Sequence, residues 1–116
     1  MRCGPSATRA HERLSGERLA CPAIVDLEVL SAWRRMVSSG ELDQRRSDLA
    51  VEDLRRLRAD RVPHLPLLAR IWELRSLTAY DAAYVALAEA LTATLLTADR
   101  RLRNAPAARC DVEVIA

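Results

Sequence analysis

The chain has 116 residues, which suits one domain, and half of them are apolar, although aromatic residues make up only 3% and Phe is absent. The net charge of +2 does not favour strong nonspecific binding to nucleic acid, which requires clustered positive charge. No apolar run approaches the ~20 residues of a membrane span, the first ten residues lack a secretory signal, and the three cysteines form no C-x-x-C pair. We therefore expect a cytoplasmic protein without a disulfide framework or a zinc site.

The first third of the chain predicts a short strand and then a long helix. Residues 6–14 are typical of the end of a helix, and 18–21 are a candidate strand. Apolar residues then recur at helical spacing over 22–38, after a proline that suits a first helical turn because its missing N–H is not needed there. Gly40 is a natural stop for this helix, and Glu28 lies near its positive end.

The middle of the chain predicts two helices with a weak strand between them. Asp43 can cap a helix over 43–58, whose outer face alternates Arg with Asp or Glu and is typical of a surface in contact with solvent. Residues 61–64 form the weak strand, and a further helix is expected over 66–75.

The last third alternates helix and strand in the same way. An Ala- and Leu-rich helix is predicted over 78–91, a buried strand over 94–97, a short helical turn over 99–103 and a last strand over 112–115. Strands that are separated by helices favour a parallel sheet flanked by helices. The sequence therefore predicts an α/β fold.

Three acidic residues lie in settings that suggest a shared role. Glu28 is in the first turns of a helix that otherwise buries apolar residues, and Asp81 is at the start of another helix. Asp99 follows the strand at 94–97, on the side where ligands bind in open parallel sheets. Each also has a purely structural interpretation: Glu28 can complement the helix dipole, Asp81 can complete a capping box with Thr78, and Asp99 can be an N-cap.

A cluster of these carboxylates would favour a bound cation. Two carboxylates at ~4 Å repel by about 1 kcal/mol in water and by roughly 4 kcal/mol at an effective dielectric constant near 20. Mg²⁺ prefers hard oxygen ligands, retains waters and can activate one of them for attack on phosphorus. If the three acids meet in space, the chemistry that they indicate is phosphodiester hydrolysis.

Four stretches resemble, in order and in spacing, the PIN-domain ribonucleases of the VapC toxin type. They are PAIVDLEVLSAWRR (22–35), HLPLLARIWELRSLTAYDAAYVALAEAL (64–91), LLTADRRL (95–102) and VEVI (112–115). The run TAYDAAY in the second stretch is the element most specific to this family, whereas LTAD alone is weak evidence for the resemblance. The resemblance covers nearly the whole chain, from about residue 6 to its end.

The resemblance implies a PIN-like three-layer fold, with a parallel sheet flanked by helices, as a single domain over 1–116. It implies that Glu28, Asp81 and Asp99 are the catalytic and metal-binding acids of a Mg²⁺- or Mn²⁺-dependent endoribonuclease, which hydrolyses RNA and often acts on tRNA. It also implies a toxin of a toxin–antitoxin module, which forms a homodimer and binds a VapB-type antitoxin.

The sequence departs from the family at its beginning. Family members open with a short apolar strand that ends in Asp and lies in the middle of the sheet, and residues 1–14 do not match this strand. No Asp precedes Asp26, so one of the family's metal ligands is absent from this sequence. The neighbouring strands would then expose unpaired N–H and C=O groups. A start codon further upstream and a truncated gene are two open explanations.

Two other functions stay open at this point. One is a truncated, catalytically inactive PIN-domain protein that only binds an antitoxin or a homologue, which the missing Asp favours. The other is a helical RNA-binding domain, which the scarcity of aromatic stacking residues disfavours. Its phosphate contacts would come from Arg34, Arg35, Arg100, Arg101 and Arg103. Trp33 and Trp72 are expected as anchors of the core or of a dimer interface.

Overall fold

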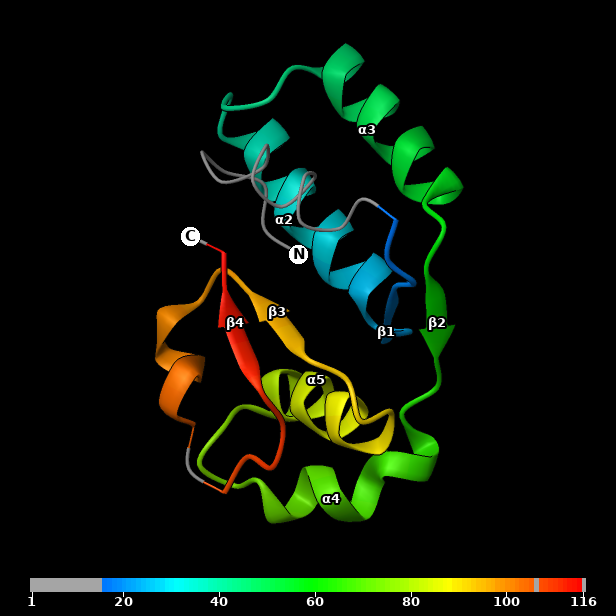
Figure 1. The fold of residues 1–116 in the computed structure, drawn as a ribbon. Helices are drawn as coiled ribbons and strands as arrows, with labels where there is room; N and C mark the ends of the chain where they lie inside the picture. Colours follow the sequence, from blue (N-terminus) through cyan, green and yellow to red (C-terminus); the bar gives the residue numbers. More distant parts are fainter. Residues whose placement is uncertain (1–15, 106, 116) are drawn as a thin grey trace.

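Strands and helices alternate along the chain in the order that the sequence predicts (Figure 1). The computed structural model describes residues 16–105 and 107–115, so the helix end predicted over 6–14 lies outside the described residues. The elements, in which η denotes a 3-10 helix, are β1 (Ala20–Pro22), α2 (Val25–Ser38), α3 (Gln44–Arg56), β2 (Asp60–Val62), η1 (Leu65–Leu67), α4 (Leu68–Glu73), α5 (Ala79–Ala90), β3 (Leu95–Thr97), η2 (Arg100–Asn104) and β4 (Val112–Val114).

Two helix starts differ from their predicted positions, and a proline lies at each of them. The helix predicted over 22–38 begins only at Val25, because Pro22 is the last residue of β1 and the backbone N–H of Ala23 continues the ladder to Val62. The helix predicted over 66–75 is divided into η1, with Pro66 in its first positions, and the short helix α4. Pro66 fits the first positions of η1 because the N–H that it lacks would have no helical partner there.

Side-chain caps fix the starts of α3 and α5 where the sequence predicts them. The Asp43 carboxylate accepts a hydrogen bond of 2.8 Å from the backbone N–H of Arg46. The Thr78 hydroxyl accepts one of 3.1 Å from the backbone N–H of Asp81. Each bond satisfies one of the backbone donors that a helix start leaves without an intrahelical partner.

The strands of the described residues form two parallel pairs. β1 pairs with β2, with Cys21 opposite Arg61, and β3 pairs with β4, with Leu96 opposite Glu113. This confirms the predicted parallel pairing and the α/β fold class. No ladder joins the two pairs within the described part of the chain.

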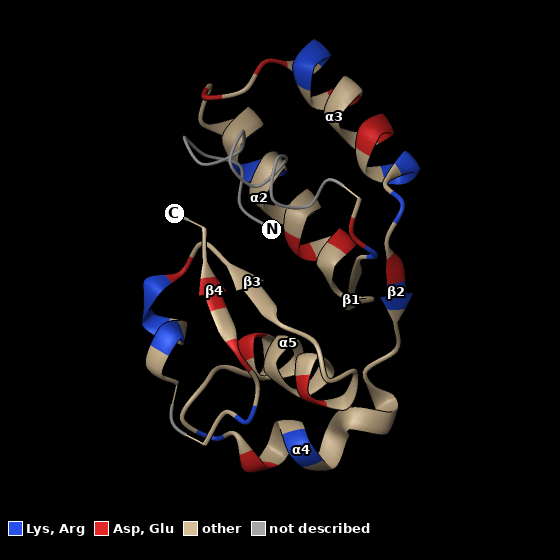
Figure 2. Cartoon of the chain, viewed as in Figure 1, with Lys and Arg blue, Asp and Glu red and all other residues tan. Residues whose placement is uncertain are grey.

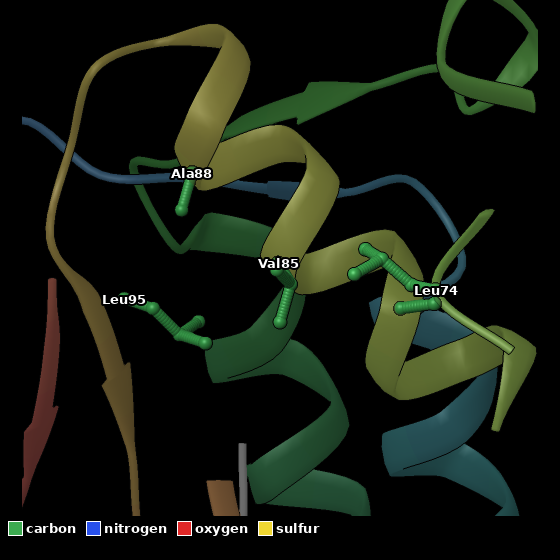
Figure 3. Packing of buried hydrophobic residues seen from close by; sticks show 5 residues of the cluster. Leu74, Val85, Ala88 and Leu95 are labelled. Atoms are coloured by element: carbon green, nitrogen blue, oxygen red, sulfur yellow. The ribbon is translucent and has the colours of Figure 1, made fainter. Parts of the chain in front are cut away.

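Helix α5 connects the two strand pairs and carries half of the buried apolar residues that the structure describes. It contacts both β1 and β3, and its residues Ala82, Val85 and Ala88 form one buried face (Figure 3). These side chains pack with Leu74 and Leu95 in a first cluster. A second cluster joins α2 to α3 through Val25, Val29 and Leu54. The small alanine side chains let α5 approach both strand pairs closely. The position of α5 therefore determines where its other side chains lie.

The two tryptophans have different environments. Trp33 packs against the second cluster, which agrees with its expected role as a core anchor. Trp72 is 69% exposed and makes a cation–π contact with Arg75 at 5.0 Å, so Trp72 does not belong to the core of this chain. No helix in the described segments is both long and apolar enough to span a membrane.

Two arginines tie distant parts of the chain together. The Arg61 guanidinium donates to the Asp26 carboxylate, at 2.9 Å from Nη2, and to backbone carbonyls at the end of α3. The Arg70 guanidinium on α4 donates to Glu89 on α5 at 2.7 and 3.0 Å, and also to the carbonyl of Ala107. Because Glu89 also accepts the backbone N–H of Arg109, this pair fixes the segment before β4.

Candidate active site

Glu28 projects from the first turns of α2 towards α5. Its Oε1 atom accepts a hydrogen bond of 2.9 Å from the Tyr84 hydroxyl, across 56 residues of sequence. Glu28 and Tyr84 are both half-buried. The interpretation of Glu28 as only a helix-dipole partner is therefore incomplete, because its carboxylate has a specific donor on another helix.

Asp81 lies one turn before Tyr84 on α5. Residues three apart share a helix face, so Asp81 and Tyr84 lie on the same side of α5. The pKa of Tyr84 is well above its usual range, first because of burial, then because of its bond to Glu28, and to a smaller extent because of the Asp81 charge. The Asp81 carboxylate is thus within electrostatic range of the hydroxyl that holds Glu28. The Thr78 cap is half of the predicted capping box.

Asp99 is the N-cap of η2, as one of its sequence interpretations predicts. Its Oδ1 atom accepts the backbone N–H of Arg101 at 2.9 Å, and its own N–H donates to the Thr97 hydroxyl at 3.0 Å. Only 12% of its side chain is exposed. The Arg101 guanidinium also donates to this carboxylate, at 2.8 Å from Nη2, so a cationic group already lies against Asp99.

Arg101 connects Asp99 electrostatically to Asp81. Its pKa is raised mainly by the hydrogen bond to Asp99 and more weakly by the charges of Asp99 and Asp81. Arg101 thus has Asp99 as its hydrogen-bonded partner, and the weaker influence of Asp81 on its pKa is purely electrostatic. Figure 2 shows the corresponding acidic segments in the first turns of α2, at one end of α5 and just ahead of η2.

The donor set fits a hard divalent cation in its chemistry, because three carboxylates supply the oxygen ligands that Mg²⁺ and Mn²⁺ prefer. Among the residues that the structure describes, however, no group of three or more His, Cys, Asp or Glu side chains is close enough to hold a metal ion. A shared metal site at Glu28, Asp81 and Asp99 thus stays a prediction, and it requires the three carboxylates to come closer together than they lie in this structure.

Sequence reasoning did not identify the contribution of Tyr84. The signal was its i,i+3 spacing from Asp81, on a helix whose other inward residues are mostly alanines. Nearby Asp26 is a contrasting case, because Arg61 holds it in a bidentate pair and gives it a structural role.

Comparison with known proteins identifies the class to which this chain belongs. The PIN domain matches residues 4–108, so the chain belongs to the PIN-domain family. Ribonuclease VapC9 of Mycobacterium tuberculosis is 43% identical over 108 residues, which are 92% of this chain and 85% of that protein. Ribonuclease VapC1 of the same species is 43% identical over 96 residues, which are 81% of this chain and 72% of that protein. Ribonuclease VapC12 of the same species is 34% identical over 113 residues, which are 97% of this chain and 88% of that protein. Within the PIN-domain family, the chain is a member of the VapC group.

Proposed function

We propose that this chain is the toxin of a toxin–antitoxin module and acts as a metal-dependent endoribonuclease. In this proposal, Glu28, Asp81 and Asp99 are both the catalytic acids and the ligands of one Mg²⁺ or Mn²⁺ ion. The observation that supports it is the hydrogen bond from Tyr84 to Glu28, which joins the proposed ligand on α2 to the helix that carries Asp81. The relatives named as ribonucleases support the same reaction class.

The chain's own residues would hold the cation and position RNA beside it. When bound, the cation would polarise a phosphate and supply an activated water for attack on phosphorus. The three carboxylates would fix its position, and their negative charge would be balanced by it. The exposed arginines Arg100, Arg101 and Arg103 on η2 lie next to Asp99, where they would bind the RNA backbone.

We propose RNA, including tRNA, as the substrate and other proteins as binding partners. Leu65, Leu68 and Trp72 are exposed apolar residues on η1 and α4. Exposed apolar residues that gather on one surface are typical of protein interfaces, and Trp is enriched there. We assign homodimer formation or binding of a VapB-type antitoxin to surfaces of this kind, in a cytoplasmic setting.

The activity is tested by incubating the purified full chain with a mixture of structured RNAs, including tRNA, in Mg²⁺, in Mn²⁺ and in excess EDTA. We expect endonucleolytic products that depend on time and on enzyme concentration with either cation, and none in EDTA. Restoring excess Mn²⁺ to the EDTA sample should restore cleavage. Cleavage of equal rate in EDTA would contradict the metal-dependent mechanism.

A second candidate function is a catalytically inactive PIN-domain protein that only binds an antitoxin or a homologue. It is favoured by the finding that no three potential ligands lie together within the described residues. The same experiment separates the two functions. No cleavage in any cation, together with a stable complex with the antitoxin encoded beside it, would support the binding function and exclude the ribonuclease.

A further inference from the structure

We propose that Tyr84 is a positioning residue of this site, whose hydroxyl holds the Glu28 carboxylate ready for a cation. The inference rests on the proposed function, because it requires Glu28 to be a metal ligand. The Tyr84 hydroxyl donates to Oε1 of Glu28 at 2.9 Å. Within the described part of the chain, Oε2 of Glu28 takes part in no hydrogen bond or ion pair, so this oxygen remains available for a cation.

The tyrosine ring is fixed from two sides. Tyr84 packs against the first core cluster, which includes Val85 and Leu95, and also against the second cluster around Val25 and Val29. Among the described residues, Tyr84 is the one that packs against both clusters, and it therefore links the helix pair α2 and α3 to the strand pair β3 and β4. A ring held in this way places its hydroxyl at a defined point. The hydroxyl then orients the Glu28 carboxylate before the cation binds, so that binding costs less of the conformational freedom of the Glu28 side chain.

Packing of the ring does not explain why residue 84 carries a hydroxyl group. A phenylalanine would fill the same space between the clusters, whereas a buried hydroxyl costs free energy unless it is hydrogen-bonded. Among the residues that the structure describes, the hydrogen-bond partner of this hydroxyl is the carboxylate of a proposed ligand, and Asp81 lies one turn away on the same face of α5.

The test compares Mn²⁺ affinity, measured by titration of the free-ion paramagnetic resonance signal, in Tyr84→Phe, Glu28→Gln and the double variant. We expect Tyr84→Phe to weaken Mn²⁺ binding about tenfold, the size typical for the loss of a hydrogen bond that orients a metal ligand. In the Glu28→Gln background, the same change should have no further effect. Tyr80→Phe is the matched control, because it removes the same hydroxyl from an exposed position one turn earlier.

The outcomes distinguish this inference from the function on which it rests. If Glu28→Gln binds Mn²⁺ as tightly as the parent chain does, the proposed metal site itself is wrong. If Glu28→Gln weakens binding but Tyr84→Phe does not, only the role of Tyr84 is wrong. A tenfold loss that persists unchanged in the Glu28→Gln background would also overturn it, because Tyr84 would then act through some other group.

Discussion

Replacing Asp81 with asparagine is expected to lower the rate of RNA cleavage by about 100-fold or more. Loss of a hydrogen bond that only orients a metal ligand typically costs 10- to 100-fold, so loss of a charged ligand should cost at least the upper end of that range. The fold should be retained, because asparagine has the same shape and the Thr78 cap uses the backbone N–H of residue 81. The measurement is the initial rate of cleavage in Mn²⁺, with circular dichroism as the check on folding.

Asp53→Asn is the matched control for this prediction. Asp53 is exposed on α3 and far in sequence from the proposed site, yet the substitution makes the same change in charge and shape. We expect its cleavage rate to equal that of the parent chain. If Asp81→Asn cleaves RNA as fast as Asp53→Asn does, Asp81 is not a ligand of a catalytic cation.

Replacing Arg70 with methionine is expected to destabilise the chain by about 3 kcal/mol, because it leaves the buried Glu89 carboxylate without its ion-pair partner. The side chains of Arg70 and Glu89 are only 18% and 12% exposed. Hydrogen bonds from Arg70 are the main reason that the pKa of Glu89 is lowered, so the folded state depends on this pairing. The substitution also removes the donor to Ala107 and so loosens the segment before β4.

The free energy of unfolding is measured by denaturant titration at neutral pH, with Arg55→Met as the control. Arg55 pairs with Glu52 on the solvent face of α3, and its side chain is 77% exposed. Such surface pairs contribute at most about 1 kcal/mol, so the control should lose far less stability. Equal losses in the two variants would show that the pair between α4 and α5 is no more important than an ordinary surface pair.

Local signals in the sequence predicted most of the elements correctly. The caps at Asp43 and Thr78 act on backbone groups within three residues, and the structure confirms both. The start of α2 was less predictable, because Pro22 fits either a first helical turn or the end of a strand, and only pairing with β2 decides between them. Such pairing joins residues about 40 positions apart and leaves no local pattern in the sequence.

The candidate site was predictable as a set of residues but not as an arrangement. The resemblance assigned roles to Glu28, Asp81 and Asp99, whereas the partner that holds Glu28 comes from a long-range contact. Tyr84 reaches Glu28 across 56 residues, and Arg61 reaches Asp26 across 35. Periodicity could not show which of the two acids at the start of α2 takes a structural partner. The exposure of Trp72 was likewise unpredictable, because a large apolar residue fits a core and an interface equally well.

The claim that one cation binds Glu28, Asp81 and Asp99 is tested most directly by paramagnetic broadening in solution. A small fraction of Mn²⁺ is added to the isotope-labelled chain, and the amide signals are followed by nuclear magnetic resonance. We predict that the signals of these three residues broaden together at the lowest Mn²⁺ fraction, while signals from the outer face of α3, such as that of Asp53, remain sharp. Broadening around only one of the three, or equally at all exposed acids, would contradict a shared metal site.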